Sequence, residues 1–337
     1  FALQGWMPNA AADDVRDLAQ RNELAVTMEP PGEDEDPPTL LHNPERVAGA
    51  EGCVTFYITP GYHTWDPTAI VFFSFSLFFA MIISDAGYGM FMAVVLAIAW
   101  RKFGEYEAGP RIRNLLVGIV SATIIYGVMV GSYFGLEPVA GSPLDWLRVR
   151  IGGTPMLDNQ NAMMVIAVAI GVAHLSLANL MSAFHTRRNL RWLGHLGWAM
   201  LMIGAFLIGS AMMAKIELLH TIGVGLASAG GISILLFSSD RPLLTFSPKT
   251  HALRLVDGVM QATNLSKAFG DVLSYLRLFA LGLASAKLAI TFNDLAGSIY
   301  EKGGIGILLA LVILLVGHGI NFLLCLMGGV VHGLRLN

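Results

Sequence analysis

Two arginines near the end of the chain lie within long apolar runs, where a fixed charge costs free energy unless it has a partner or a function. The predicted helix face of Arg277 carries small and polar residues, namely Thr263, Ser266, Gly270, Ser274 and Ala284. The last apolar run has a similar face, which holds Asn321, Cys325, Gly328, His332 and Arg335. Such faces indicate a close neighbouring helix or a water-lined groove rather than lipid, and the two helices could share one site.

Arginine suits a proton path better than lysine, because its guanidinium stays charged when it is partly desolvated. A fixed positive charge makes an approaching carboxylate release its proton, and it prevents protons from running straight across the membrane. The nearest acid, Asp271, lies about 120° round the predicted helix from Arg277; it is predicted to pair with Lys267, four residues earlier. The residues alone leave two hypotheses open: an ion-transfer site, or arginines paired with carboxylates of other helices.

The composition is that of a protein with several membrane spans. Of 337 residues, 55% are hydrophobic and 13% are charged, against about 25% charged in ordinary soluble domains. These values exclude a soluble enzyme, a disordered chain and a basic nucleic-acid binder. Cys53 and Cys325 are too far apart in the sequence to indicate a disulfide framework or a zinc site. The sequence contains no catalytic, cofactor-binding or metal-binding motif, and we expect no cofactor.

Residues 1–66 are polar and unlike the rest of the chain. Asn9 is predicted to cap a short helix, residues 24–28 to form a strand, and the acidic, proline-rich residues 30–38 to form a linker. We interpret 1–66 as the remnant of a small cytoplasmic α/β domain with its linker, and 67–337 as a membrane domain. We also expect the chain to be an interior piece of a longer protein.

The first apolar run, 68–100, is too long for one span: its 33 residues would form a helix of about 50 Å, against a hydrocarbon core of about 30 Å. Because Asp85-Ala-Gly-Tyr-Gly89 lies in its middle, we predict two short helices with a turn there. Further spans are predicted over 112–136, 160–184, 192–214, 218–238, 253–298 and 304–336. The last two exceed a perpendicular crossing and must tilt. The sequence thus predicts an all-α polytopic membrane protein with eight transmembrane helices, two of them long and tilted.

Basic residues in the loops indicate the orientation. With the polar N-terminal segment in the cytoplasm, the inner loops hold ten Lys or Arg residues and the outer loops hold four, in line with the positive-inside rule. Treating 68–100 as a single span would reverse this bias, so we expect both chain ends to be cytoplasmic. Within the span 112–136, Gly127, Gly131 and Gly135 are predicted to let a neighbouring helix approach closely.

Several short motifs occur in order along nearly the whole chain. The most specific are Ser274-Tyr-Leu-Arg-Leu-Phe-Ala-Leu-Gly-Leu-Ala284 and Val331-His-Gly-Leu-Arg-Leu336. Others are Gly5-Trp-Met-Pro8, Asp36-Pro-Pro-Thr-Leu-Leu-His-Asn-Pro44, Asp66-Pro-Thr68, Asp85-Ala-Gly-Tyr-Gly89 and Gly317-His-Gly-Ile-Asn321. Together they resemble the membrane domain of the stator subunit a/I of V-type and archaeal or bacterial V/A-type rotary ATPases. The proline-rich linker is more similar to the prokaryotic V/A form.

This resemblance implies that two long, tilted helices embrace a rotating proteolipid ring (the c/L ring), and that two offset half-channels lead protons to and from a ring carboxylate. Two arginines of this chain would face that carboxylate. The resemblance gives these candidate residues for proton translocation: Arg277, Arg335, His332, Ser274, Asn321, Asp85 and Glu137. Within this set, His332 would lie beside the path, and Asp85 and Glu137 are candidates for the half-channel that opens outside.

The resemblance also implies partners and a location. The chain would be a non-catalytic, ion-translocating subunit in a prokaryotic plasma membrane, surrounded by lipid, with no nucleic-acid partner. Peripheral stalk subunits and the central-stalk cap would bind through an N-terminal arm outside this sequence. Two positions depart from the eukaryotic pattern, because Cys325 and Thr263 stand where that pattern has acidic residues. The residues of the inner half-channel therefore stay open.

Three other classes of membrane protein are alternatives to this hypothesis. A stand-alone secondary transporter would need a midplane site, usually between inverted repeats, and the sequence shows no such repeat. A structural membrane anchor would use its arginines only to lock helices. A membrane enzyme would need a nucleophile–base pair or a metal cluster, but the histidines lack ligand spacing, and His174, His195 and His318 are predicted to be packing residues.

Overall fold

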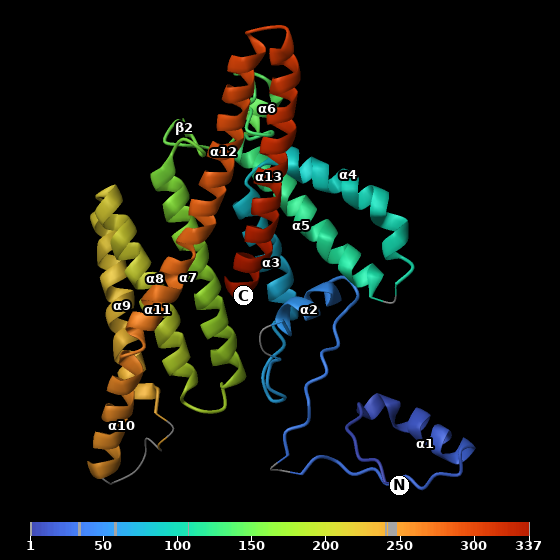
Figure 1. Ribbon diagram of the computed structural model, residues 1–337. Coiled ribbons are helices and arrows are strands. Elements are labelled where there is room, and N and C mark those ends of the chain that lie inside the picture. The colour runs from blue at the N-terminus through green and yellow to red at the C-terminus, as the bar shows by residue number, and fades with distance from the viewer. Residues whose placement is uncertain are drawn as a thin grey trace.

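The computed structural model describes residues 2–32, 35–56, 59–106, 108–239, 241 and 248–336, and this part of the chain is almost entirely helical (Figure 1). The elements are η1 (Asn9–Ala11), α1 (Ala12–Arg21), η2 (Ala48–Ala50), α2 (Glu51–Val54), α3 (Thr68–Ile83), α4 (Ala86–Phe103), α5 (Gly109–Val130), α6 (Pro143–Trp146), β1 (Arg150–Ile151), β2 (Thr154–Pro155), α7 (Gln160–His185), α8 (Trp192–Ala214), α9 (Glu217–Phe237), α10 (Pro248–Ala262), α11 (Leu265–Ser274), α12 (Leu276–Tyr300) and α13 (Ile305–Leu336).

The chain is an all-α polytopic membrane protein. In the described residues, seven helical segments are long and apolar enough to cross a membrane, with α10 to α12 taken as one segment. The apolar helix α3, with 16 residues, is shorter than these. Together they correspond to the eight predicted segments. The small sheet consists of β1 and β2 alone, which pair antiparallel with Arg150 opposite Pro155.

The predicted break between residues 85 and 89 is confirmed. Ser84 ends α3 in the left-handed conformation, with φ of 53°, and Asp85 begins α4 in an extended conformation. The two helices do not form a packed hairpin, however. Each packs instead against α5, and α4 and α5 together form an arm beside the upright α3 (Figure 1).

The predicted long helix 253–298 is divided into three. It is interrupted after Ala262 and again at Tyr275, which separates α11 from α12. Helix α13 is continuous over 32 residues. Helices α12 and α13 pack along each other, and both contact α3. This places the two predicted arginine-bearing helices side by side (Figure 1).

The N-terminal segment differs from its prediction. Asn9 caps no helix through its side chain, because a 3₁₀ turn precedes α1, whose N-cap residue is Ala11. Residues 24–28 form no strand in the described structure. The predicted strand was wrong because five suitable residues cannot form a ladder without a partner strand. Of the predicted acidic linker, residues 33 and 34 lie outside the described residues.

The predicted close approach at Gly127 is confirmed, but the three glycines do not lie on one helix. Helix α5 ends at Val130, and Gly131 follows it with φ of +80°. A Cβ added at Gly127 would overlap the backbone nitrogen of Ala86 at the start of α4. Gly127 therefore sets how closely α5 meets the α3–α4 junction.

We expect the substitution Gly127→Ala to destabilise the membrane domain by about 1–3 kcal/mol, because backbone at a helix junction must move to admit the methyl group. Thermal unfolding of the detergent-solubilised protein measures this. Gly225→Ala on α9 is the matched control, since nothing lies within 4 Å of a Cβ at that position. Equal unfolding temperatures for the two variants would contradict the expectation.

Candidate functional site

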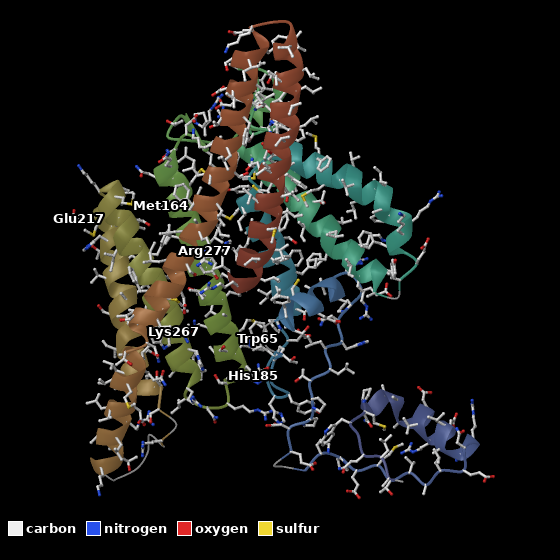
Figure 2. All side chains as sticks on the ribbon, in the orientation of Figure 1. Trp65, Met164, His185, Glu217, Lys267 and Arg277 are labelled. Carbon is white, nitrogen blue, oxygen red and sulfur yellow. The ribbon has the colours of Figure 1, made fainter. Side chains whose placement is uncertain are left out.

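The strongest candidate site lies between α12 and α13. Arg277, in the first turn of α12, places its Nη1 atom 3.4 Å from Nδ1 of His332 on α13. Both side chains are half-buried. Figure 2 shows Arg277 near the lower end of α12, midway along the molecule. The structure thus brings together two of the predicted residues that are 55 positions apart in the sequence.

The second arginine is placed differently. Arg335 lies in the last turn of α13 and is exposed. Within the described residues, neither Arg277 nor Arg335 forms an ion pair with a carboxylate. The hypothesis that both arginines are locked to carboxylates of other helices in this chain therefore has no support in the described part of the structure.

A groove runs along the α12–α13 pair toward Arg277. Its volume is about 420 Å³, and its wall includes Leu281, Ser285, Asn321, Cys325, Leu324 and His332. Most of this wall is apolar, with a few polar groups from facing helices. A groove of this kind on the surface of two membrane helices can admit water or a neighbouring helix.

Asn321 forms part of the wall of this groove rather than pointing freely into it. It is 1% exposed, and its amide nitrogen donates to the Tyr88 hydroxyl at 3.1 Å and to the backbone carbonyl of Ser285 at 3.0 Å. The Cys325 thiol lies 3.0 Å from Oγ of Ser285. These contacts join α4, α12 and α13 through buried polar groups, which stabilise a unique packing only when all are satisfied.

Ser274 is not brought to the Arg277–His332 contact by a hydrogen bond. Its hydroxyl donates to the backbone carbonyl of Asp271, in its own helix, at 2.6 Å. Ser274 is also the last residue of α11, so the break at Tyr275 separates it from Arg277. Its predicted part in proton translocation stays a prediction.

Asp85 is buried, with 1% exposure, and its carboxyl group accepts four hydrogen bonds. Oδ1 accepts from the backbone N–H groups of Tyr88 and Phe134 at 3.0 and 2.9 Å. Oδ2 accepts from the Ser132 hydroxyl at 2.6 Å and from the backbone N–H of Gly135 at 2.9 Å. Asp85 therefore caps α4 and holds the loop after α5 against it. Whether it also serves a half-channel stays a prediction.

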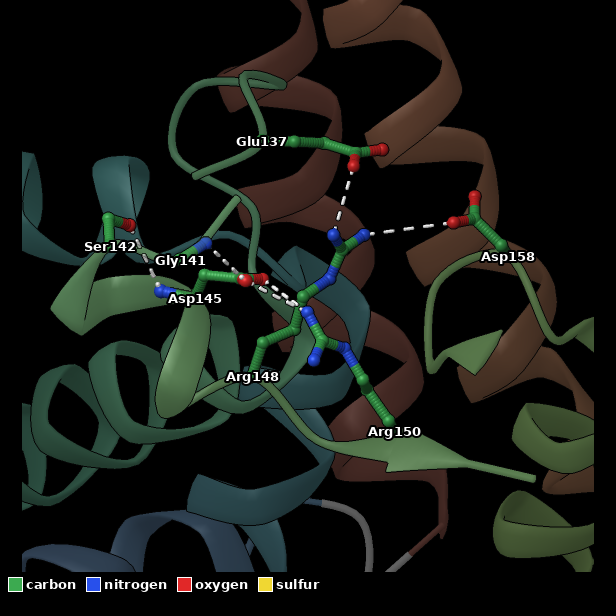
Figure 3. Close-up of polar contacts among 7 residues, drawn as sticks. All are labelled: Glu137, Gly141, Ser142, Asp145, Arg148, Arg150 and Asp158. Atoms are coloured by element: carbon green, nitrogen blue, oxygen red, sulfur yellow. Dashed lines mark hydrogen bonds and ion pairs between the residues drawn. The ribbon is translucent and has the colours of Figure 1, made fainter. Parts of the chain in front are cut away.

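Glu137 belongs to a polar cluster in the loops between α5 and α7 (Figure 3). Its carboxylate lies 3.0 Å from Nη1 of Arg148, whose Nη2 lies 3.7 Å from Asp158. The Arg148 side chain is 5% exposed, whereas Glu137 is 47% exposed. Glu137 is thus the accessible partner of a buried arginine. Nothing in the sequence indicates this burial, because Arg148 resembles any other basic residue in a loop.

Both carboxylate oxygens of Asp145 in the same cluster accept from Nη2 of Arg150, at 2.7 and 2.8 Å. The hydrogen bond from the backbone N–H of Gly141 is the largest of the effects that hold the pKa of the Asp145 carboxyl below its usual range. Burial acts in the opposite direction, and Arg150 and Arg148 lower the pKa further. The loop is therefore pinned by ionised groups (Figure 3).

A second cavity, of about 350 Å³, lies among α7, α8 and the α10–α11 segment. Its polar lining residues include Asn179, Arg191, His195, Gln261, Lys267 and Asp271. The predicted ion pair between Lys267 and Asp271 is not formed, although both residues are described and line the same cavity. Figure 2 shows Lys267 below Arg277, toward the α10 end of the molecule. This cavity is not predicted from the sequence, which indicates only a packing role for His195.

Comparison with known proteins gives one consistent group of relatives. V-type ATP synthase subunit I of Chlamydia pneumoniae is 28% identical over 407 residues, covering 100% of this chain and 57% of that protein. A-type ATP synthase subunits I of Methanocaldococcus jannaschii and Pyrococcus abyssi are 27% and 28% identical, each over 100% of this chain and over 52% and 50% of their own lengths. The chain thus spans about half of the length of these relatives. No protein-family profile matches it.

Proposed function

We propose that this chain, a homologue of subunit I of the V-type and A-type ATP synthases, is the membrane stator of a rotary ATPase and transfers protons. In this proposal Arg277 and Arg335 face a carboxylate on a rotating proteolipid ring. Two half-channels connect that carboxylate with the two sides of the membrane. The chain itself catalyses no covalent reaction, and ATP chemistry belongs to other subunits of the complex.

The observation that carries this proposal is the environment of Arg277. The guanidinium is half-buried beside a groove, and among the contacts found for it in the described residues its polar partner is the His332 ring rather than a carboxylate. A desolvated arginine without a carboxylate is unfavourable, so its charge is available to a carboxylate that another subunit supplies. A structural anchor would pair this arginine within the chain.

Two polar regions support the two half-channels. The cavity lined by His195, Lys267 and Asp271 lies toward the α10 end of the molecule, and we assign the inner half-channel to it. At the end of the molecule away from α10 lies α6 (Figure 1). The loops around it hold half-exposed Glu137 and its partner Arg148. We assign the entrance of the outer half-channel to this loop cluster, next to Asp85, which accepts from the backbone N–H groups of Phe134 and Gly135.

The same proposal sets location and partners. The chain is a multi-pass membrane protein, and we propose that it resides in a prokaryotic plasma membrane with both ends in the cytoplasm. Residues 1–66 would then end a cytoplasmic domain, and 67–337 would form the membrane domain. Peripheral stalk subunits and the central-stalk cap are its proposed partners.

Site-directed crosslinking in the purified complex tests the ring contact. Ala284 is exposed beside the groove, so a photo-crosslinker on Ala284→Cys should capture a small proteolipid with an intramembrane carboxylate. Cys53 and Cys325 are replaced by serine in all variants, and Leu218→Cys on α9, where Leu218 is 71% exposed, is the control. Capture of lipid alone at Ala284, or equal capture at both positions, would overturn the proposal.

A further inference from the structure

A buried hydrogen-bonded chain crosses from the surface of α13 to the α12–α13 groove. Nδ1 of His318 lies 2.8 Å from the Tyr88 hydroxyl, and Nε2 of His318 lies 3.0 Å from Oδ1 of Asn293. Asn321, which lines the groove, donates to the same Tyr88 hydroxyl. Tyr88 is 2% exposed, whereas His318 is half-buried. The chain therefore connects a partly accessible ring with the buried wall of the groove.

The partners fix the direction of these hydrogen bonds. Because Asn321 donates to the Tyr88 oxygen, the hydroxyl hydrogen of Tyr88 is available for Nδ1 of His318. The Asn293 amide nitrogen donates to the backbone carbonyl of Phe134 at 2.8 Å, so its oxygen is left for Nε2–H of His318. The hydrogen bonds of all four residues thus fit one neutral tautomer of His318, with its hydrogen on Nε2 and the lone pair of Nδ1 accepting from the Tyr88 hydroxyl.

We propose that His318 and Tyr88 form a proton relay between the α12–α13 groove and the side of the membrane on which the α12–α13 turn lies. The proposal rests on the proposed function, because it assigns the residues that carry protons between the groove and that side. Polar and ionisable residues within a membrane bundle commonly mark such relays. The sequence alone predicts only a packing role for His318.

The relay step balances with water as the only co-reactant. When the Asn321 amide turns away from the Tyr88 hydroxyl, groove water takes its place and delivers a proton to the Tyr88 oxygen. The original O–H bond of Tyr88 breaks as an N–H bond forms at Nδ1 of His318. The resulting imidazolium then releases its Nε2 proton to water on the accessible side. The ring then turns so that Nδ1 faces the same water, where Nδ1 loses its proton and Nε2 gains one, and it turns back in its starting tautomer. One proton enters at Tyr88, and one leaves at His318.

The competing explanation is a purely structural lock. The His318 ring makes edge-to-face contacts with Tyr88 and Phe134, with centroids 6.0 Å apart in each case. The carboxyl group of Asp85 adjoins this series of hydrogen bonds, because its Oδ1 accepts from the backbone N–H of Tyr88. A lock needs only these contacts and hydrogen bonds, whereas a relay also needs a group that takes up and releases a proton.

Two substitutions separate these explanations. His318→Gln can still accept from Tyr88 and donate to Asn293, but an amide does not carry a proton at neutral pH. Tyr88→Phe keeps the aromatic ring and removes only the relay oxygen. In vesicles with the intact complex, we expect each variant to lower ATP-driven proton uptake at least about tenfold, as for loss of a proton-transfer group, with assembly retained. His220→Gln, at an exposed site on α9, should have no effect.

Chemical rescue supplies a readout that a lock would not give. In His318→Ala, added imidazole should restore part of the lost uptake, because the ring site is partly accessible. Near-normal proton uptake by His318→Gln would overturn the relay. The relay would also be overturned if His318→Gln failed to assemble and His318→Ala gained no uptake from added imidazole. Arg277→Gln, measured in parallel, separates failure of the relay from failure of the proposed function. If both His318→Gln and Arg277→Gln retain proton uptake, the proposed function is wrong. If Arg277→Gln loses uptake and His318→Gln retains it, only the relay is wrong.

Discussion

Replacing Asp85 with alanine is expected to prevent the membrane domain from assembling in a stable form. The substitution leaves three backbone N–H groups, those of Tyr88, Phe134 and Gly135, without their acceptor inside the protein. Each unsatisfied buried donor costs about 1–3 kcal/mol, so the total loss is at least about 3 kcal/mol. This is a large part of the stability of an ordinary domain, about 5–15 kcal/mol.

The amount of assembled complex in membranes and its thermal unfolding temperature measure this effect. Asp85→Asn is the informative companion, because its amide oxygen still accepts while the second oxygen is lost. We expect this variant to assemble with a lower unfolding temperature. If Asp85→Ala unfolds at the wild-type temperature, the capping role is wrong. If Asp85→Asn assembles but loses proton uptake, Asp85 also belongs to the outer half-channel.

The break at Asp85 shows what local sequence can predict in a membrane protein. A charged residue followed by two glycines within an apolar run predicts a helix end, because the free carboxyl is costly in lipid and can cap the next helix. The partners of that carboxyl could not be predicted, since Ser132, Phe134 and Gly135 lie about fifty positions later. The periodicity of apolar residues identifies one face of a transmembrane helix, but it does not show which other helix packs against that face.

The polar faces of the last two helices predict the candidate site better than the basic residues of the loops do. Arg277 and His332 were both placed on small, polar helix faces by periodicity, and the structure brings them within 3.4 Å. Arg148 could not be singled out, because its burial depends on how the loop around Asp145 folds back on α5 and on the carboxylates of Glu137 and Asp158. Loop burial is a tertiary property that charge counting does not reveal.

The substitution Arg277→Gln is expected to abolish ATP-driven proton uptake while the complex still assembles. Glutamine fills similar space and can donate to His332, but it carries no charge. Without that charge, a carboxylate that enters the groove has no reason to lose its proton, because desolvation favours the neutral acid. Arg277→Lys should restore little activity, since a partly desolvated ammonium can lose its proton whereas guanidinium does not.

Arg335 supplies the matched comparison. It is exposed at the end of α13, whereas Arg277 is half-buried beside the groove. Charges that water can reach are strongly screened, so Arg335→Gln should lower uptake less than Arg277→Gln does. A larger loss for Arg335→Gln would place the encounter with the carboxylate at the end of α13 instead.

The most direct measurement is therefore proton uptake driven by ATP in vesicles that contain the purified complex with Arg277→Gln, with subunit composition and unfolding temperature determined on the same preparation. We expect the complete complex at its normal unfolding temperature and no uptake above that of empty vesicles. Uptake near the wild-type rate by the fully assembled complex would show that Arg277 only packs α12 against α13 and that protons take another path.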